Sequence, residues 1–286
     1  MKTNFSVIVP AYKENKIYNT LNLLLQQKNN QFNLQRIFLI ASGYEDKIVF
    51  NHPKVIVIEE KVRKGKIAAI NMALKKIHSE LIIVESGDTI PKKDTIEKLL
   101  RPFKDPTVGM TCGRPIPISS KKTFLGFLTH LIWFLHHLIS LERAKGGEII
   151  AFRKIFNKIP TKIAADEAYV ESVFSKKDYK IVYVPTAIVN NFGIENLSYI
   201  LDQRKRYFIG HLHIKQKYGY FVSSMSIKRI FKALFEYFKI KSIQNYKETF
   251  WIFCAIFLET YARILASIEF YIFKKVPYKW KIVRLG

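Results

Sequence analysis

The sequence predicts an α/β fold, with a mostly parallel sheet flanked by helices and followed by a helical C-terminal tail. Short β-branched and apolar runs alternate with segments that carry apolar residues at helical spacing. Strands that alternate with helices join through right-handed crossovers, which place successive strands in parallel. Beyond about residue 215 the composition changes to basic and long apolar segments. A chain of 286 residues is long enough for one large domain with such an appendage.

The elements of the domain follow in chain order. Residues 5–9 predict a buried strand, because this β-branched run is closed by Pro10. Residues 81–85 predict another strand, which ends in a turn at Gly87. By the same reasoning we expect strands at 36–41, 54–58, 147–153 and 181–184, and helices at 17–27 and 66–77. Ligands of such a sheet bind beyond the carboxyl ends of its strands. We therefore expect the loops at 10–15, 42–46 and 86–89 to meet in one crevice.

Three further segments predict helices that contact a membrane. Residues 124–141 carry no formal charge, and polar side chains recur among them at helical spacing, which favours an amphipathic helix at the domain surface. Its length also permits a span, but a span between two functional segments would split the domain. Residues 227–243 are basic and amphipathic.

Residues 250–273 are long and apolar but include Glu259, Arg263 and Glu269. Each charge costs about 2.5–3.5 kcal/mol at a bilayer centre. Pairing of Glu259 with Arg263 one turn later lessens that cost. We favour helices that lie in the membrane plane or insert partly, with a clean span as the alternative.

The net charge of +24 favours anionic partners. Aromatic residues, 14% of the chain, gather in apolar helices rather than between Lys and Arg. This favours an anionic membrane surface, and because no recognition motif is present we expect no nucleic-acid partner. The first residues run directly into a strand without a cleavable signal. We therefore expect the protein at the cytoplasmic face of the cell membrane.

Four short segments carry the functional signal. They read SVIVPAY at 6–12, KGK at 64–66 followed by Asn71, IIVESGDT at 82–89, and QRKRY at 203–207. In this order and at these separations they resemble the inverting glycosyltransferases of family 2, in the branch with a Q-x-x-R-W motif. That branch includes polysaccharide synthases and ceramide glucosyltransferases. The resemblance covers about residues 4–215. It implies a GT-A domain over residues 1–215, followed by a membrane-associating tail over 216–286.

The resemblance implies a nucleotide-sugar site. The loop from Pro10 corresponds to the family's segment at the base and ribose, and Lys66 falls in its R-x-G-K-x-x-A-x-N motif near the phosphates. Where the family strand ends in D-D-G-S-x-D, residues 41–46 read ASGYED, so the first acidic pair is absent and Ser42 is left to contact the base. The donor is therefore expected to be linked to UDP or to GDP, and the sequence does not choose between them. The binding residues implied are Pro10, Ala11, Tyr12, Glu14, Ser42, Lys66, Asn71, Ser86, Gly87, Asp88, Gln203, Arg204, Arg206 and Tyr207.

The family's metal-binding D-x-D reads Ser86-Gly87-Asp88 in this chain. Asp88 is the one carboxylate retained in that motif. Mg²⁺ and Mn²⁺ prefer hard oxygen ligands and accept water and substrate phosphates in the remaining positions. The resemblance therefore implies a divalent metal, Mg²⁺ or Mn²⁺, held by Asp88 together with the donor phosphates.

Asp166 and Glu167 occupy the place of the family's E-D segment, whose Asp deprotonates the acceptor. Counting back from residues 178–185, which resemble G-Y-x-x-x-Y-V-P, puts Glu167 at the base position. A shift of one residue puts Asp166 there, and Asp166 is preferred because the family uses the shorter acid. Arg206, with Arg204, would grip the leaving diphosphate. Tyr207 replaces the Trp that lines the acceptor channel.

These residues predict an inverting glycosyltransferase that moves a sugar from a nucleotide-diphosphate sugar to a hydroxyl of a glycan or lipid-linked acceptor. The chemistry needs a cation on the leaving diphosphate and a carboxylate base on the acceptor hydroxyl. The alternative is a catalytically silent protein of the same fold, which binds nucleotide sugars or serves as a membrane scaffold. The carboxylates missing at Ala41 and Ser86 motivate that alternative.

Overall fold

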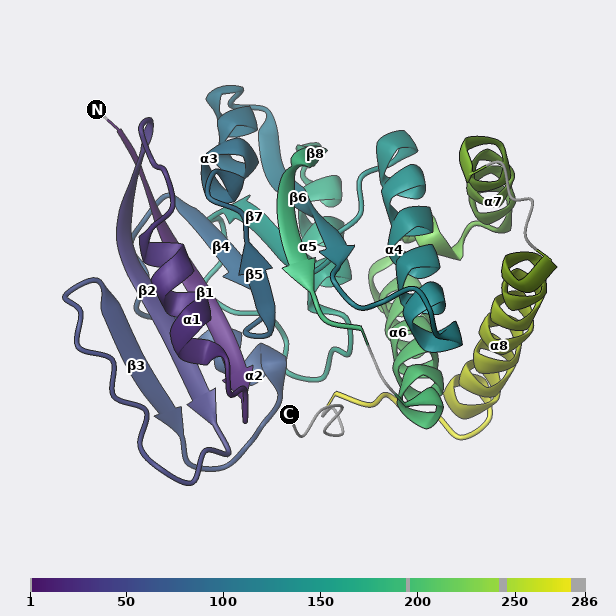
Figure 1. Cartoon of the computed structure of the whole chain (residues 1–286). Coiled ribbons are helices and arrows are strands. Elements are labelled where there is room, and N and C mark those ends of the chain that lie inside the picture. The colour runs from purple at the N-terminus through teal and green to yellow at the C-terminus, as the bar shows by residue number, and fades with distance from the viewer. Residues whose placement is uncertain (1, 194–195, 242–245, 279–286) are drawn as a thin grey trace.

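The computed structural model describes residues 2–193, 196–241 and 246–278 (Figure 1). In this part of the chain, eight strands form a sheet in the order β3-β2-β1-β4-β7-β6-β8-β5. Their bounds are β1 (Thr3–Tyr12), β2 (Phe32–Ser42), β3 (Val55–Glu60), β4 (Leu81–Glu85), β5 (Thr89–Pro91), β6 (Val108–Pro117), β7 (Ile149–Arg153) and β8 (Lys180–Asn191). The β1–β2, β1–β4, β2–β3 and β6–β8 pairs are parallel, whereas β7 runs antiparallel to β4 and β6, and β5 to β8. The predicted α/β fold with a mostly parallel sheet is confirmed.

Helices cover both faces of the sheet. They are α1 (Ile17–Leu25), α2 (Lys66–Leu74), α3 (Thr95–Leu100), which continues into a 3₁₀ turn (Arg101–Lys104), and α5 (Asp166–Lys176). Side chains alternate between the faces of a strand. Phe5, Val7 and Val9 of β1 therefore pack with α1 and α3, and Ile8 packs with α2 and α5. Since both faces are covered, β4 is buried along its whole length.

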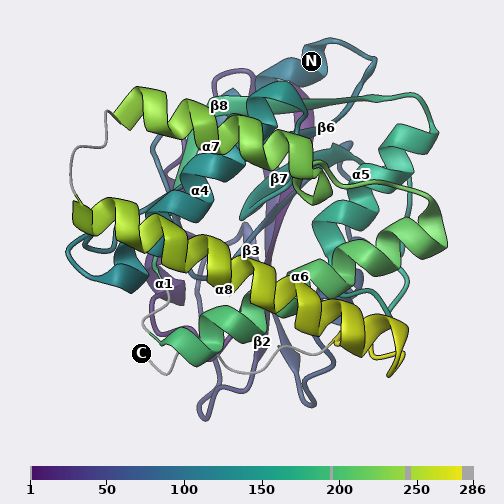
Figure 2. The ribbon, with the colours of Figure 1, turned by 90° about the vertical axis from the view of Figure 1, so that its right-hand side faces the viewer.

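Four longer helices lie to one side of the sheet (Figures 1 and 2). They are α4 (Phe124–Glu142), α6 (Leu197–Tyr218), α7 (Ile227–Lys241), which follows a 3₁₀ turn (Ser223–Met225), and α8 (Tyr246–Tyr271). The Thr123 side chain begins α4 by accepting a hydrogen bond from the backbone N–H of Gly126. Gly219, with φ of 67°, ends α6 in the left-handed conformation that glycine adopts without strain. Helix α8 packs on α6, and α4 packs on both α7 and α8.

Helices α4 and α8 are each long and apolar enough to cross a membrane. Helix α4 is partly buried against β6 and β8, whereas α8 exposes Phe250, Phe253 and Phe257. The expected pairing of Glu259 with Arg263 is confirmed, at 2.7 Å. Helix α6 runs across the expected boundary at residue 215, and that division stays a prediction. Residues 242–243 of the helix predicted at 227–243, and residues 279–286 of the tail, lie outside the described residues.

Candidate active site

A cavity of about 1480 Å³ opens at the carboxyl edge of the sheet. Residues 10–15 and 86–88 form part of its wall, and of residues 42–46 only Ser42, the last residue of β2, lines it. The Tyr44 hydroxyl accepts a hydrogen bond from the backbone N–H of Glu14 at 3.0 Å, so the loops after β1 and β2 meet as predicted, next to the cavity. Helices α4, α6, α7 and α8 form a second part, and residues near the starts of α2, β7 and α5 and the end of β8 complete the wall. The residues that the sequence assigns to the site and that line this cavity are Pro10, Ala11, Tyr12, Glu14, Ser42, Lys66, Ser86, Gly87, Asp88, Glu167, Gln203, Arg204 and Tyr207.

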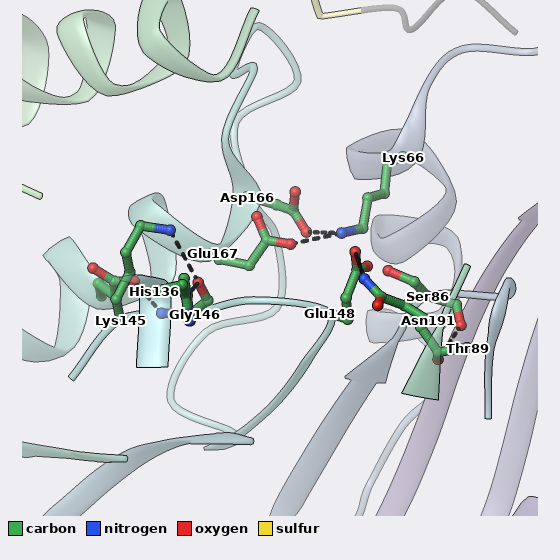
Figure 3. A network of polar contacts seen from close by, with 11 residues as sticks. Lys66, Ser86, Thr89, His136, Lys145, Gly146, Glu148, Asp166, Glu167 and Asn191 are labelled. Carbon is green, nitrogen blue, oxygen red and sulfur yellow. Dashed lines mark hydrogen bonds and ion pairs between the residues drawn. The ribbon is translucent and has the colours of Figure 1, made fainter. Parts of the chain in front are cut away.

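Lys66 joins the two carboxylates that the sequence offers as the base (Figure 3). It is the first residue of α2, directly after Gly65, whose φ of 102° is a conformation that side chains disfavour. Its Nζ lies 3.0 Å from Oδ2 of Asp166 and 2.8 Å from Oε1 of Glu167. Asp166 and Glu167 open helix α5, where the helix dipole favours negative charge. The three residues therefore form one ion-pair cluster between the starts of two helices.

The two carboxylates of this cluster differ in burial and in pKa. Burial, and then the neighbouring charge of Glu167, raises the pKa of Asp166 to about 7. Burial would also raise the pKa of Glu167, but the Lys66 ammonium outweighs it and lowers that pKa below its ordinary value. Asp166 is buried and is not among the described residues that line the cavity, whereas Glu167 lines it. Of these two carboxylates, Glu167 is therefore the one that a ligand in the cavity meets.

Glu148 is a functional candidate that the sequence reasoning missed. It immediately precedes β7, and its carbonyl oxygen accepts a hydrogen bond from the backbone N–H of Ser86 at 3.1 Å. Burial, and then the charge of Asp88, raises the pKa of Glu148 to about 7. Asn191, at the end of β8, places its amide nitrogen 3.5 Å from Oε1 of Glu148 (Figure 3). Because β7 runs antiparallel to β4, the beginning of β7 lies at the edge of the sheet where the parallel strands end. An all-parallel sheet, in which only strand ends lie at that edge, would not place Glu148 there.

The ends of β2 and β3 form another polar part of the wall. Ser42 pairs with Glu60 across these strands, and both line the cavity. Ser42 is 5% exposed, and its hydroxyl has no hydrogen-bond partner among the described residues. The Arg63 guanidinium lies 3.8 Å from the centre of the Tyr12 ring, a cation–π contact. This corner holds an unsatisfied hydroxyl, a carboxylate and a flat aromatic surface, which suit a nucleobase.

The Q-x-x-R-Y segment lies on α6. Some of its side chains line the cavity, and some contact the neighbouring helix α8 or are buried. Arg204 donates two hydrogen bonds to Glu259 of α8, at 2.7 and 3.1 Å, and Glu259 also binds Arg263. The guanidinium expected on the diphosphate thus already has a carboxylate partner. Arg206 is buried, with its guanidinium carbon 5.3 Å from the centre of the Tyr207 ring, and it is not among the described residues that line the cavity.

Asn71 and Glu14 have structural contacts. The Asn71 amide donates to the carbonyl of Ile159 and accepts from its N–H, both at 2.7 Å, so it ties α2 to the loop before α5. Asn71 is buried and lies outside the cavity lining of the described residues. Oε1 of Glu14 accepts from the backbone N–H of Lys16 at 3.1 Å, just before α1. Glu14 also lines the cavity, so this contact does not exclude ligand binding.

The oxygen atoms near Asp88 are of the kind that Mg²⁺ and Mn²⁺ prefer. Among the described residues, no three His, Cys, Asp or Glu side chains gather closely enough to hold a metal ion by themselves. Asp88 and Glu148 supply two carboxylates, and Oδ1 of Asn191 is buried without a hydrogen-bond partner in the described part of the chain. Hard oxygen donors of this number fit a cation whose remaining ligands are donor phosphates and water.

Comparison with known proteins shows the family. The family model for glycosyl transferase family 2 matches residues 6–176, more than half of the chain. The chain therefore belongs to glycosyl transferase family 2, as the sequence motifs indicated.

The relatives and the fold agree with this assignment. A poly-beta-1,6-N-acetyl-D-glucosamine synthase of Staphylococcus aureus is 24% identical over 78% of this chain and 57% of its own length. A dolichyl-phosphate beta-glucosyltransferase of Trichomonas vaginalis is 29% identical over 41% of this chain and 39% of its own. The chain thus spans between about two fifths and three fifths of these relatives. The structure of a Pyrobaculum calidifontis mannosyltransferase, in complex with GDP-Man and Mn²⁺, superposes with a TM-score of 0.62 at 16% identity and covers 96% of this chain and 89% of that one. The predicted GT-A fold is confirmed.

Proposed function

We propose that this protein transfers a sugar from a UDP- or GDP-linked donor to a hydroxyl of a lipid-linked acceptor or glycan, at the cytoplasmic face of the cell membrane. The reaction is a single displacement that inverts the anomeric centre. The observation that carries the proposal is geometric: Glu167 lines the cavity 2.8 Å from the Lys66 ammonium, and residues 10–15 and 86–88, which resemble the family's donor-binding segments, line the same cavity.

Donor binding uses the wall at the carboxyl edge of the sheet. The corner of Ser42, Glu60 and Tyr12 takes the nucleobase, and the backbone around Gly87 approaches the sugar diphosphate. A Cβ atom on Gly87 would lie 3.0 Å from Cβ of Ala11, so glycine keeps these two loops close together. When bound, Mg²⁺ or Mn²⁺ supplies positive charge that stabilises the leaving diphosphate, and Asp88 would hold it.

Glu167 is the base in this proposal, in preference to Asp166. It lines the cavity and is ionised, whereas Asp166 is buried and holds its proton more tightly. The Lys66 ammonium that lowers the pKa of Glu167 also forms an ion pair with it at 2.8 Å. An anionic diphosphate in the cavity competes for Lys66, and withdrawal of that ammonium raises the pKa of Glu167. The carboxylate then becomes a stronger base at the moment when the acceptor hydroxyl must lose its proton.

The acceptor side of the cavity is apolar. Leu131 and Leu135 of α4, Leu234 of α7 and Leu258 of α8 contribute to this wall. Apolar walls of this extent bind hydrocarbon better than a hydrated glycan. Helix α7 exposes Phe231 and Phe235 together with four lysines, Lys228, Lys232, Lys239 and Lys241, and α8 exposes further aromatic residues. Such a surface suits anionic lipid, and a lipid-linked acceptor would reach the cavity from the membrane.

The test is transfer of label from UDP-[¹⁴C]glucose, UDP-[¹⁴C]GlcNAc or GDP-[¹⁴C]mannose into the organic-solvent extract of membranes that contain the protein. We expect one donor to label this fraction, and Glu167→Gln to abolish the label. Glu142→Gln is the matched control, because Glu142 is a surface carboxylate of α4 paired with Arg229 and Lys232. A silent scaffold predicts nucleotide binding with no turnover of any donor. Label confined to water-soluble glycan would exclude a lipid acceptor.

A further inference from the structure

The D-x-D motif of this chain has lost its first carboxylate, and a different strand brings a carboxylate to the same place. Ser86 occupies the first position of the motif, directly after β4. Glu148 opposes it across the antiparallel β4–β7 pair, where Glu85 pairs with Ile149 and the next backbone hydrogen bond joins Ser86 to Glu148. Residues opposed in this way have neighbouring side chains. The Glu148 carboxyl therefore lies beside the side chain of residue 86, and the Ser86 hydroxyl hydrogen-bonds to it (Figure 3).

Three strand ends contribute oxygen atoms to this point. Asp88 lies between β4 and β5, Glu148 precedes β7, and Asn191 ends β8, where it pairs with Thr89. All three side chains line the cavity. Asn191 is 4% exposed, and its Oδ1 has no hydrogen-bond partner among the described residues, although its amide nitrogen lies beside Glu148. A buried carbonyl oxygen without a donor is costly, and a cation removes that cost.

The loop that carries Glu148 is held rigidly from several sides. The backbone N–H of Gly146 donates to Oε1 of Glu171 at 2.6 Å, and the carbonyl of Gly146 contacts Nε2 of His136 at 3.1 Å (Figure 3). A Cβ atom on Gly146 would lie 2.6 Å from Cβ of Glu167, so the loop also packs closely on the base. Metal ligands need such fixed positions, because a mobile carboxylate loses entropy on binding.

We infer that Glu148 replaces the missing first aspartate of the D-x-D motif, so that Asp88 and Glu148 together bind the divalent cation, with the Asn191 carbonyl oxygen as a further ligand. This inference rests on the proposed function only in the identity of the remaining ligands, which are the donor phosphates. It assigns the metal site to two loops instead of one. It also explains how the chain tolerates a serine at position 86.

The test measures Mn²⁺ binding directly, by the loss of the free Mn²⁺ electron paramagnetic resonance signal. The full-length protein in detergent is titrated with Mn²⁺ in the presence of saturating GDP and, separately, UDP. We expect wild type to bind Mn²⁺ with one of these nucleotides. Glu148→Gln keeps the shape of the side chain and removes the charge, and should weaken Mn²⁺ binding about tenfold or more. Glu142→Gln is the matched control, which should leave Mn²⁺ binding unchanged.

A second variant moves the carboxylate back to the family position. Glu148→Ala should lose Mn²⁺ binding, and the double variant Ser86→Asp with Glu148→Ala should regain it, since the shortened residue 148 leaves room for the aspartate. Thermal unfolding without metal checks that each variant is folded. If Glu148→Gln is unstable, the inference is tested by whether the double variant regains the Mn²⁺ binding that Glu148→Ala has lost. Wild-type Mn²⁺ affinity in Glu148→Gln would overturn the inference. Failure of wild type to bind Mn²⁺ with either nucleotide would also overturn it, whereas the label-transfer assay reports separately on glycosyl transfer.

Discussion

Replacing Glu167 with glutamine removes the charge that faces the cavity and keeps the size of the side chain. The comparison with Asp166→Asn is informative because both residues bind the same ammonium, at 2.8 and 3.0 Å from Lys66 Nζ. Only Glu167 lines the cavity, and only Glu167 has a pKa below its ordinary value. The two variants therefore make the same substitution, carboxyl to amide, at sites with different access to substrate.

The expected magnitude follows from the role of a general base. Removal of a positioned base lowers turnover by about 10²–10⁴, which corresponds to about 2.7–5.4 kcal/mol of transition-state stabilisation. Glu167→Gln should show this loss with nearly unchanged affinity for the donor. Asp166 is buried, and its raised pKa of about 7 means that a neutral amide resembles its protonated form. Asp166→Asn should therefore lose less than about tenfold in turnover, the equivalent of about 1.4 kcal/mol.

The assay is the initial rate of nucleoside diphosphate release with saturating donor and acceptor, together with donor affinity from thermal shift. Thermal unfolding without ligand controls for damage to the ion-pair cluster. A loss in Asp166→Asn as large as in Glu167→Gln would refute the assignment of the base to Glu167. Wild-type rates in both variants would mean that these carboxylates only begin helix α5.

Three other perturbations test separate parts of the structure. Burial raises the pKa of Glu85 to about 8, so ionisation of Glu85 lowers the free energy of unfolding as pH rises from about 5 to 8. Above pH 8, Glu85→Gln should therefore be more stable than wild type by about 3–5 kcal/mol. Parallel profiles of stability against pH for the two proteins would contradict this prediction. Asn71→Ala should lower the free energy of unfolding by about 2–4 kcal/mol, because it leaves both backbone groups of Ile159 unpaired, and an unchanged urea midpoint would contradict this contact. In flotation assays the protein should bind phosphatidylglycerol vesicles at low salt. Replacing the exposed Phe235 and Phe253 with Asp should weaken this binding about tenfold or more. Equal flotation of the variant and wild type would exclude this face as the membrane contact.

The strands with buried β-branched runs were predictable from the sequence because their pattern is local. Residues 81–85 were expected as a strand, and β4 has the same bounds. The meeting of the loops after β1, β2 and β4 followed from the geometry of parallel strands. The loops after β1 and β4 line the cavity together, and Tyr44 joins the loop after β2 to the loop after β1. The short strand β5 and helix α3 carry no such run, and the sequence did not predict them.

The site was less predictable because its decisive contacts join segments far apart in the chain. Glu148 reaches Ser86 through an antiparallel pair that the alternating pattern of strands and helices does not reveal. Arg204 matches a family motif, but its partner Glu259 lies on a helix whose packing no motif describes. Asn71 also matches a motif, and its amide instead serves the backbone at Ile159. A motif thus locates a residue in the fold without fixing which neighbour its side chain binds.

The configuration of the product tests the central claim most directly. An α-linked nucleotide sugar, the donor identified by label transfer, is incubated with the protein and acceptor, and ¹H NMR follows the anomeric proton of the first product formed. Single displacement with Glu167 as base predicts a β-linked product with no α-linked product before it. An α-linked product would show retention and contradict this mechanism. Absence of any donor turnover by the folded, membrane-bound protein would contradict glycosyl transfer itself.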